Sequence, residues 1–268
     1  PLAGLPLMID RLREAYGIDF NHYKPATISR RIDRRLALGE FNSLQAYVER
    51  ISTDSTELEL LYKDLLIGVT RFFRDPEAFE VVQTQVIPPL VDSTGPEDEI
   101  RVWVPGCATG EEPYSLAMLF QEYLQQSKSK ATVRIFASDV HRESLHTASE
   151  GLYPEASLEE LSPERRARFF VREGRSYRVH SDLRRMLIFS PQNLIKDPPF
   201  TKMDLVSCRN VLIYFQPQAQ LRALSAFHFA LKLNGALVLG PSEGPGDLAP
   251  EFAVVDRQWK VYRKIRDT

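Results

Sequence analysis

The chain has 268 residues, of which 43% are hydrophobic and 26% are charged, and its formal net charge is -2 at pH 7. This length suits one large domain, or one domain with a small companion, and the near-neutral charge excludes a protein that binds polyanions over its whole surface. No apolar run of the sequence reaches the length of a membrane span, so we expect no direct membrane insertion. The two cysteines are far apart, which excludes a disulfide framework and fits a cytoplasmic protein. The chain begins with Pro1 rather than Met, so we expect a piece of a longer protein.

The first part of the chain is predicted to be an N-terminal helical domain at residues 1–90. Amphipathic patterns predict helices over residues 5–16, 27–38, 43–51 and 54–66. Asp75-Pro76-Glu77 predicts another helix that ends at Pro88-Pro89, because an acid before proline is a typical helix start. The loop at 92–98 (DSTGPED) is expected to separate this domain from the rest.

The second predicted helix is strongly basic. Its arginines are spaced to lie on neighbouring faces: Arg30, Arg31, Arg34 and Arg35. A solvated helix face explains them most simply. The alternative is a docking surface for an acidic partner, since complementary charge aids encounter and orientation.

Residues 91–268 change to alternating strands and helices. The predicted strands are EIRVWV, ATVRIFASD, MLIFS, MDLVSC and GALVLG, and FAVVD with WKVYRK is predicted to form a closing hairpin. Helices are expected after the first, second and fourth of these strands. This alternation predicts an α/β domain with a mostly parallel sheet covered on both faces.

The stretch GCATGEEPYS, residues 106–115, links the first strand to its helix. Small residues at Gly106, Ala108 and Gly110 would let a ligand approach the backbone at the strand end, where parallel sheets bind ligands. A phosphate would be repelled by Glu111 and Glu112, so the loop favours a ligand with cationic groups, such as S-adenosylmethionine. The alternative is that both acids face water and only complement the helix dipole.

Asp139 ends the second predicted strand, in FASDV. An acid at this place commonly binds ribose hydroxyls, although it could also cap the next helix. Together with the two glutamates, Asp139 favours a nucleoside that carries a positive tail.

Several stretches resemble the chemotaxis receptor methyltransferase (CheR-type) family of protein-glutamate O-methyltransferases. They are ISRRIDRRL, VTRFFRD, CATGEEPYS, FASDV, NLIKDPPF and SCRNVLIYF, and their wording is closest to the methyltransferase part of methylesterase–methyltransferase fusion proteins. The resemblance implies a Rossmann-like S-adenosylmethionine-dependent methyltransferase domain at 91–268, after the N-terminal helical domain. It also implies a small inserted β-subdomain at about 169–182, and further signalling domains fused to this chain.

The resemblance implies a role for individual residues as well. The implied cofactor-binding residues are Thr70, Arg74, Gly106, Glu111, Asp139, Asn193, Leu194, Arg209 and Asn210. Among them, Asp139 would bind the ribose, Asn193 and Leu194 would lie near the adenine, and Arg209 and Asn210 near the methionine end. Arg74 and Tyr214 match positions discussed as catalytic in the family. The implied partner is the acidic helices of a chemoreceptor cytoplasmic domain, bound by the four arginines above.

Two departures from the family pattern have consequences. Relatives often carry Asn where this chain has Gly68, so one cofactor hydrogen bond is expected to be missing. The β-subdomain loop is shorter than in members that dock a receptor's C-terminal pentapeptide, which puts that tether in question here.

Methyl transfer to a glutamate needs no general base, because a carboxylate with a pKa near 4.3 is already ionised at neutral pH. The enzyme has to align the reacting atoms and exclude water. Arg74 could hold a carboxylate oxygen. Tyr214 could hydrogen-bond the carboxylate or pack its ring against the sulfonium. The alternatives are an ion pair of Arg74 with Asp75 or Glu77, a core position for Tyr214, and an ordinary loop role for Asn210.

Other functions are disfavoured by the sequence. GPSEG (240–244) matches a hydrolase nucleophile elbow, but Pro245-Gly246 follows where a helix should begin. DPPF (197–200) resembles a loop of nucleic-acid methyltransferases, but it precedes the fourth strand and the chain has no extended basic surface. His141 and His146 are expected to be surface histidines rather than a metal site. A sensory module that binds S-adenosylmethionine, and a methyltransferase with another acceptor, remain the alternative functions.

Overall fold

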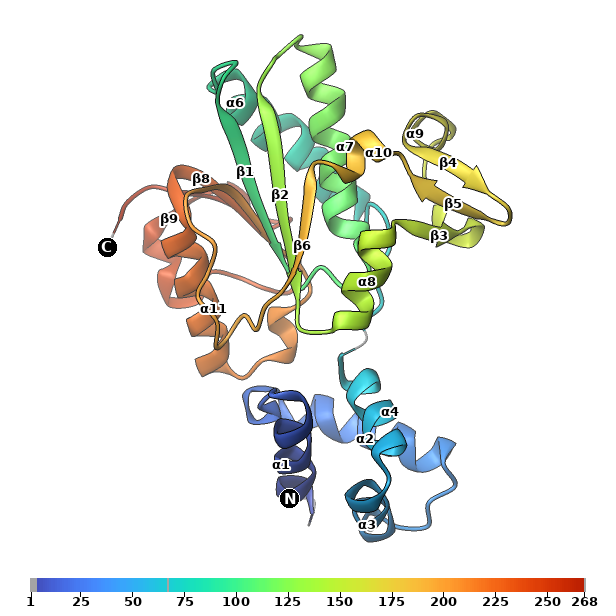
Figure 1. Cartoon of the computed structure of the whole chain (residues 1–268). Coiled ribbons are helices and arrows are strands. Elements are labelled where there is room, and N and C mark those ends of the chain that lie inside the picture. The colour runs from blue at the N-terminus through green and yellow to red at the C-terminus, as the bar shows by residue number, and fades with distance from the viewer. Residues whose placement is uncertain (1–3, 67, 268) are drawn as a thin grey trace. The chain divides into compact units, whose positions relative to one another are not determined.

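The computed structural model describes residues 4–66 and 68–267. The chain forms two compact units. The first comprises Pro1–Gly68 with Tyr214–Gln220, and the second comprises Val69–Ile213 with Leu221–Thr268 (Figure 1). In the described residues, every helix is too short or too polar to cross a membrane.

The first unit is helical, as predicted. Its elements are α1 (Leu5–Tyr16), the 3-10 turn η1 (Phe20–His22), α2 (Pro25–Leu38), α3 (Leu44–Thr53) and α4 (Ser55–Leu66). Gly17 ends α1 in the left-handed conformation, and Ser43 caps α3 by accepting a hydrogen bond from the backbone of Ala46. Asp54 accepts from the first backbone N–H groups of α4, but Glu57 does not return the capping contact, because its carboxylate binds Arg35.

Apolar side chains from the four helices and η1 make the core of the first unit. Fully buried examples are Met8, Leu12, Phe20, Ile32, Tyr47 and Leu61. The segment 214–220 joins this unit through backbone hydrogen bonds from Lys24 to Tyr214 and from Gln216 to His22. Tyr23 and Phe215 also pack edge to face, with ring centroids 5.1 Å apart.

The expected domain boundary at residue 90 is corrected by the structure. Residues 69–90 belong to the second unit, and the division lies between Gly68 and Val69. The physical reason is burial: Phe72, Phe79 and Ile87 lie in the same apolar core as the central sheet and its first long helix. This segment is helical, like the first unit, but its apolar side chains pack in the core of the second unit.

This segment is also less regular than predicted. It consists of α5 (Pro76–Val81), the π-helical turn η2 (Val82–Val86) and α6 (Ile87–Asp92). The two prolines predicted to end the helix lie instead in the first turn of α6, where a missing N–H costs nothing. Asp75 precedes α5 but makes no capping hydrogen bond with its side chain.

A seven-stranded sheet forms the centre of the second unit. Its strands are β1 (Glu99–Pro105), β2 (Thr132–Asp139), β6 (Leu187–Pro191), β7 (Met203–Cys208), β8 (Leu231–Leu239), β9 (Phe252–Asp256) and β10 (Val261–Lys264). They are arranged in the order β6-β2-β1-β7-β8-β10-β9, with parallel pairing from β6 to β8 and antiparallel pairing of β10 with both neighbours. The predicted strands and the closing hairpin are confirmed, and the parallel part is a Rossmann-like doubly wound sheet.

Helices cover both faces of this sheet, as predicted. They are α7 (Glu111–Gln126), α8 (Arg142–Glu150) and α11 (Pro217–Ala230). Val102 and Val104 of β1 join the core that includes α7, whereas Trp103 packs against Phe227 of α11. Successive side chains of a strand point to opposite faces, so β1 is buried from both sides.

A separate three-stranded antiparallel sheet is inserted between α8 and β6 (Figure 1). Its strands are β3 (Leu152–Pro154), β4 (Phe170–Glu173) and β5 (Ser176–Val179), and the turns and helices η3 (Glu155–Leu158), α9 (Pro163–Phe169) and α10 (Ser181–Arg184) accompany them. The expected insert at 169–182 contains β4 and β5. The sheet also includes β3, which is only three residues long and pairs with β5.

Candidate functional site

The candidate site lies at the carboxyl edge of the parallel strands. In the sheet register, Pro105 of β1 pairs with Ser138 of β2, and Asp139 pairs with Pro191 of β6. On the other side of β1, Cys208 of β7 pairs with Leu239 of β8. The loops that follow these strands therefore begin at one edge. The strand order reverses between β1 and β7, which is where such sheets bind ligands.

The glycine loop after β1 is wound tightly. Gly106 and Gly110 adopt φ of 68° and 99°, and Ala108 also lies in the left-handed region at 48°. A Cβ at Gly106 would lie 2.6 Å from Cγ2 of Val211, which belongs to the loop after β7. Gly106 is therefore required for packing between the two loops, in addition to any approach of a ligand.

Asp139 holds the glycine loop to the end of β2. Its Oδ2 accepts a hydrogen bond from the backbone N–H of Ala108 and its Oδ1 accepts from that of His141, both at 2.9 Å. Burial raises the pKa of the Asp139 carboxyl, and these hydrogen bonds oppose the rise. Each carboxylate oxygen has a second lone pair that can accept from a ribose hydroxyl. The cap of α8 is His141, so the capping alternative for Asp139 is wrong.

The two glutamates at the start of α7 have different environments. Glu111 is buried, at 7% exposure, and its carboxylate accepts a 2.7 Å hydrogen bond from Thr109 Oγ1. Burial raises its pKa, against the effect of this hydrogen bond. Glu112 instead accepts from Ser207 Oγ and from Arg209. The expectation that both acids act alike is corrected: Glu112 is an internal partner of Arg209, and neither acid merely faces water.

Arg209 is the centre of a buried charge cluster. Its side chain is 3% exposed, and its Nη1 donates to Glu112 Oε2 at 3.1 Å and to the backbone oxygen of Arg74 at 2.9 Å. Its Nη2 donates to Asp75 Oδ2 at 2.8 Å. The guanidinium therefore clamps the loop at 69–75 to the end of β7 and the start of α7.

The loop that carries Thr70 and Arg74 is fixed by contacts of its backbone. Phe73 and Asp75 have positive φ values of 49° and 57°, which is unusual for residues other than glycine. The N–H of Phe73 donates to Ser115 Oγ of α7 at 3.0 Å. Asp75 binds Arg209, and Arg74 Nη1 donates to the carbonyl of Val69, so the structure does not contain the alternative Arg74–Asp75 pair.

A chain of polar side chains fixes the loop after β6. Trp103 Nε1 donates to Ser138 Oγ, which donates to Gln192 Oε1 at 2.6 Å. The next residue, Asn193, accepts from the backbone N–H groups of Ile195 and Lys196 with its side-chain oxygen. Asn193 and the half-buried Leu194 are thus held in a closed turn at the same strand edge as Asp139.

The loop after β7 depends on a residue that the sequence analysis did not select. Asn210 has a positive φ of 61°, and its backbone N–H donates to the carboxylate of Glu243. Glu243 lies in the GPSEG stretch. The segment after it is a 3-10 turn, η5 (Gly246–Glu251), so the helix of a nucleophile elbow is absent from this described stretch.

Three predicted residues are placed differently from the strand-edge group. Tyr214 belongs to the first unit, where its carbonyl accepts from Lys24, so its catalytic role stays a prediction. His141 is buried rather than at the surface, and its Nδ1 lies 2.6 Å from Ser144 Oγ. Arg35 pairs with Glu57 at 2.9 Å and lies 3.7 Å from Asp64, with 12% of its side chain exposed.

Arg35 therefore stabilises the first unit internally, because its carboxylate partners lie on α4. This corrects the expectation that all four arginines form one docking surface. Arg30 and Arg34 are exposed, and Arg31 is half-buried.

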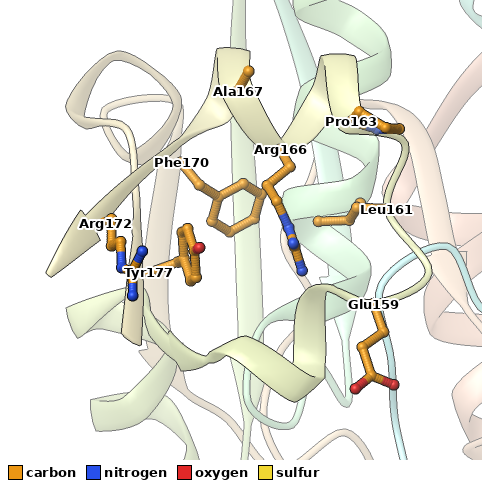
Figure 2. Close-up of a pocket in the computed structure, with 8 residues that line it drawn as sticks. All are labelled: Glu159, Leu161, Pro163, Arg166, Ala167, Phe170, Arg172 and Tyr177. Atoms are coloured by element: carbon orange, nitrogen blue, oxygen red, sulfur yellow. The ribbon is translucent and has the colours of Figure 1, made fainter. Parts of the chain in front are cut away.

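A pocket of about 700 Å³ lies in the inserted subdomain, away from the strand edge. Figure 2 shows its lining residues: Glu159, Leu161, Pro163, Arg166, Ala167, Phe170, Arg172 and Tyr177. Arg166 lies over the ring of Tyr177, 5.3 Å from its centroid. All of these residues come from the segment between β3 and the end of β5, so this pocket and the strand-edge site are distinct.

Two acids at the strand edge have the chemistry to bind a nucleoside that carries a cationic group. Asp139 is an acceptor of the kind that binds ribose hydroxyls, and the buried acid Glu111 suits a cationic group. Arg209 at this edge is already bound by Glu112 and Asp75, so its charge is not available to a phosphate. In the described parts of the chain, no group of three or more His, Cys, Asp and Glu side chains is arranged to hold a metal ion.

Comparisons with known proteins show the family of this chain. The model of the CheR methyltransferase all-alpha domain matches residues 3–66, and that of the CheR methyltransferase SAM binding domain matches residues 68–261. Chemotaxis protein methyltransferase 1 of Pseudomonas aeruginosa is 33% identical over 250 residues, which cover 91% of each chain. A chemotaxis protein methyltransferase of Borreliella burgdorferi is 30% identical, over 85% of this chain and 83% of the relative. An uncharacterized 104.1 kDa protein of Rhodobacter capsulatus is 40% identical over 99% of this chain, which spans 28% of that protein.

Proposed function

Because this chain belongs to the CheR methyltransferase family and is an S-adenosylmethionine-dependent methyltransferase, we propose that it methylates glutamate side chains of chemoreceptor cytoplasmic helices. The products are glutamyl methyl esters and S-adenosylhomocysteine. Neutralising these carboxylates would reduce repulsion between receptor helices and so change signalling. The observation that carries the proposal is the acidic strand edge, with Asp139 and Glu111 held beside a tightly wound glycine loop.

The cofactor side of the proposal uses the residues that the structure gathers at this edge. Asp139 accepts hydrogen bonds from the ribose hydroxyls, and the turn with Asn193 and Leu194 lies against the adenine. Glu111 faces the positive tail of the cofactor. S-adenosylmethionine would supply the methyl group of its sulfonium, which passes to the acceptor oxygen by in-line displacement with S-adenosylhomocysteine as the leaving group.

Arg209 contributes through its position rather than through a free side-chain charge. The guanidinium of Arg209 is occupied by two carboxylates and the Arg74 carbonyl, so its role is to fix the loop that carries Thr70 and Arg74. Asn210 presents its amide at the methionine end. This assignment replaces direct binding of the cofactor by the Arg209 side chain.

The acceptor side needs orientation of a carboxylate that is already ionised. Arg74 can turn its guanidinium toward one oxygen of the substrate glutamate, because its Nη1 donates to the backbone carbonyl of Val69 and not to a carboxylate of the described residues. The other oxygen then attacks the methyl carbon. Exclusion of water would strengthen the contact of Arg74 with this carboxylate.

Receptor docking is proposed for the exposed arginines of α2. Arg30 and Arg34 lie one turn apart and are exposed, which suits an acidic helix as the partner. The strands β4 and β5 are joined by only Gly174 and Arg175. We therefore base docking on α2 and not on a peptide tether at this turn.

Transfer of tritiated methyl groups to receptor cytoplasmic fragments tests the proposal. We expect the label to appear on the fragment and to be released as methanol by mild base, as glutamyl esters require. A base-stable label would indicate an acceptor other than a carboxylate. Binding of S-adenosylhomocysteine without transfer to any receptor fragment would favour a sensory module.

A further inference from the structure

A buried carboxylate just beyond β8 joins two of the loops at the strand edge. Glu243 is 8% exposed, and its Oε1 accepts backbone hydrogen bonds from Gly240 at 2.7 Å and Asn210 at 2.8 Å. Its Oε2 accepts from Val211 and Ile213, both at 3.1 Å. Four backbone dipoles thus stabilise a carboxylate at a depth where an unpaired charge would be costly.

The four donors belong to loops that follow neighbouring strands. Asn210, Val211 and Ile213 come after β7, whereas Gly240 comes after β8. A Cβ at Gly240 would lie 2.6 Å from Oε1 of Glu243 and 2.8 Å from the nitrogen of Asn210. Glycine at 240 therefore leaves the space in which the carboxylate and the β7 loop meet.

The same β7 loop determines where the glycine loop can lie. Val211 packs so closely on Gly106 that no side chain fits there. Asn210 is held with φ of 61°, in the left-handed region that asparagine tolerates better than other non-glycine residues but adopts less often than negative φ. The hydrogen bonds from the backbone N–H groups of Asn210 and Val211 to Glu243 stabilise this conformation.

We infer that Glu243 is a positioning residue of the cofactor site, which fixes residues 209–213 against the glycine loop. Its two oxygens are filled by four backbone donors, so it acts through Asn210 and Val211 and not on a ligand. The inference rests on the proposed function in one respect, namely that the strand edge binds S-adenosylmethionine.

Substitution of Glu243 by glutamine tests this role. The amide keeps the size of the side chain but offers one acceptor oxygen and directs N–H groups at two backbone donors. We expect E243Q to raise the Kd for S-adenosylhomocysteine and the KM for S-adenosylmethionine by about tenfold or more. Asp247→Asn is the matched control, because Asp247 is an exposed acid four residues further on, and it should leave both constants unchanged.

These constants are measured by calorimetry and steady-state kinetics, at a temperature where circular dichroism shows each variant to be folded. Loss of global stability alone would leave the Kd of the folded protein unaltered. Hydrogen exchange at Asn210, Val211 and Ile213 should accelerate in E243Q, while the amides of β7 stay protected. A wild-type Kd and KM in E243Q would overturn the inference.

A second variant tests the carboxylate itself. Glu243→Ala leaves four backbone donors around an empty anion site, so added formate should restore much of the lost affinity for S-adenosylhomocysteine, and chloride at equal ionic strength should not. Failure of formate to restore binding in the folded variant would count against the inference. Failure of the wild-type protein to bind S-adenosylhomocysteine would instead overturn the proposed function, so the two failures are distinguishable.

Discussion

The strand edge of the second unit and the basic face of α2 hold their charges in opposite ways. At the strand edge, Arg209, Glu112 and Asp139 are tied to specific partners at 2.8–3.1 Å, and Arg209 is almost fully buried. On α2, Arg30 and Arg34 are exposed to solvent. In the proposed function, the strand edge is organised before its small ligand arrives, whereas α2 meets a large partner through screened charge.

The largest expected effect is on stability, from breaking the buried clamp. Arg209→Ala would leave Glu112 and Asp75 without their cation, and we expect the second unit to lose about 3 kcal/mol of unfolding free energy. This value is at the lower end of the range for buried pairs, because Asp75 is partly exposed. Urea denaturation of the variant and the wild type measures the change. A loss below about 0.5 kcal/mol would show that the cluster does not hold the loop at 69–75.

The next effect is on cofactor affinity. Asp139→Ala removes both the expected ribose acceptor and the partner of the Ala108 amide, so the Kd for S-adenosylhomocysteine should rise by about 100-fold. Calorimetry checks this value. Asp204→Ala is a suitable control. Asp204 lies at the start of β7, where it binds Lys232 and the Arg101 backbone, and so at the opposite end of the strand from the candidate site. Equal affinities of the wild type and the Asp139 variant would place the ribose elsewhere.

Charge reversal on α2 should act on the acceptor and not on the cofactor. We expect the double variant Arg30→Glu, Arg34→Glu to lower methyl transfer to receptor fragments about tenfold at low salt, with less effect at high salt. Its Kd for S-adenosylhomocysteine should be that of the wild type. Arg257→Glu is the control, since Arg257 is exposed on the second unit. A loss of cofactor affinity in the double variant would remove the distinction between the two regions.

The smallest effect is a pH dependence with a defined sign. Burial raises the pKa of Asp139 and Glu111 above their ordinary values in the free protein. The folded protein therefore binds more protons than the unfolded chain at mildly acidic pH, and its stability should fall as pH rises through this window. A cationic ligand and ribose hydroxyls favour the ionised acids, so affinity for S-adenosylmethionine should rise a few-fold over the same window. Calorimetry at several pH values checks this, and Asp139→Asn should flatten the profile.

Sequence reasoning succeeded where the signal is local. The period of apolar residues predicted α1 and the strands, and the position of Asp139 at the end of β2 follows from that strand alone. The three-residue strand β3 carries too little pattern to be recognised. The boundary at residue 68 depends on the core in which Phe72 and Ile87 are buried. The local sequence does not indicate which of the two cores this is.

The partners of the charged residues could not be predicted for a related reason. Arg35 pairs with Glu57 on α4, and Arg209 pairs with Asp75, which is 134 residues earlier in the chain. The role of Glu243 requires knowing that the loops after β7 and β8 are neighbours. Residue types at a strand end thus predicted the place of the proposed site, whereas the hydrogen-bond partners that fix these residues came only from the packed structure.

A crystal structure with S-adenosylhomocysteine bound tests the central claim most directly. We predict the ribose hydroxyls on Asp139, the amino acid tail beside Glu111 and the β7 loop, and the carboxylate of Glu243 still bound by the backbone of Asn210. A ligand bound away from the carboxyl edge of β1 and β2, or an Asp139 without contact to the ribose, would contradict it.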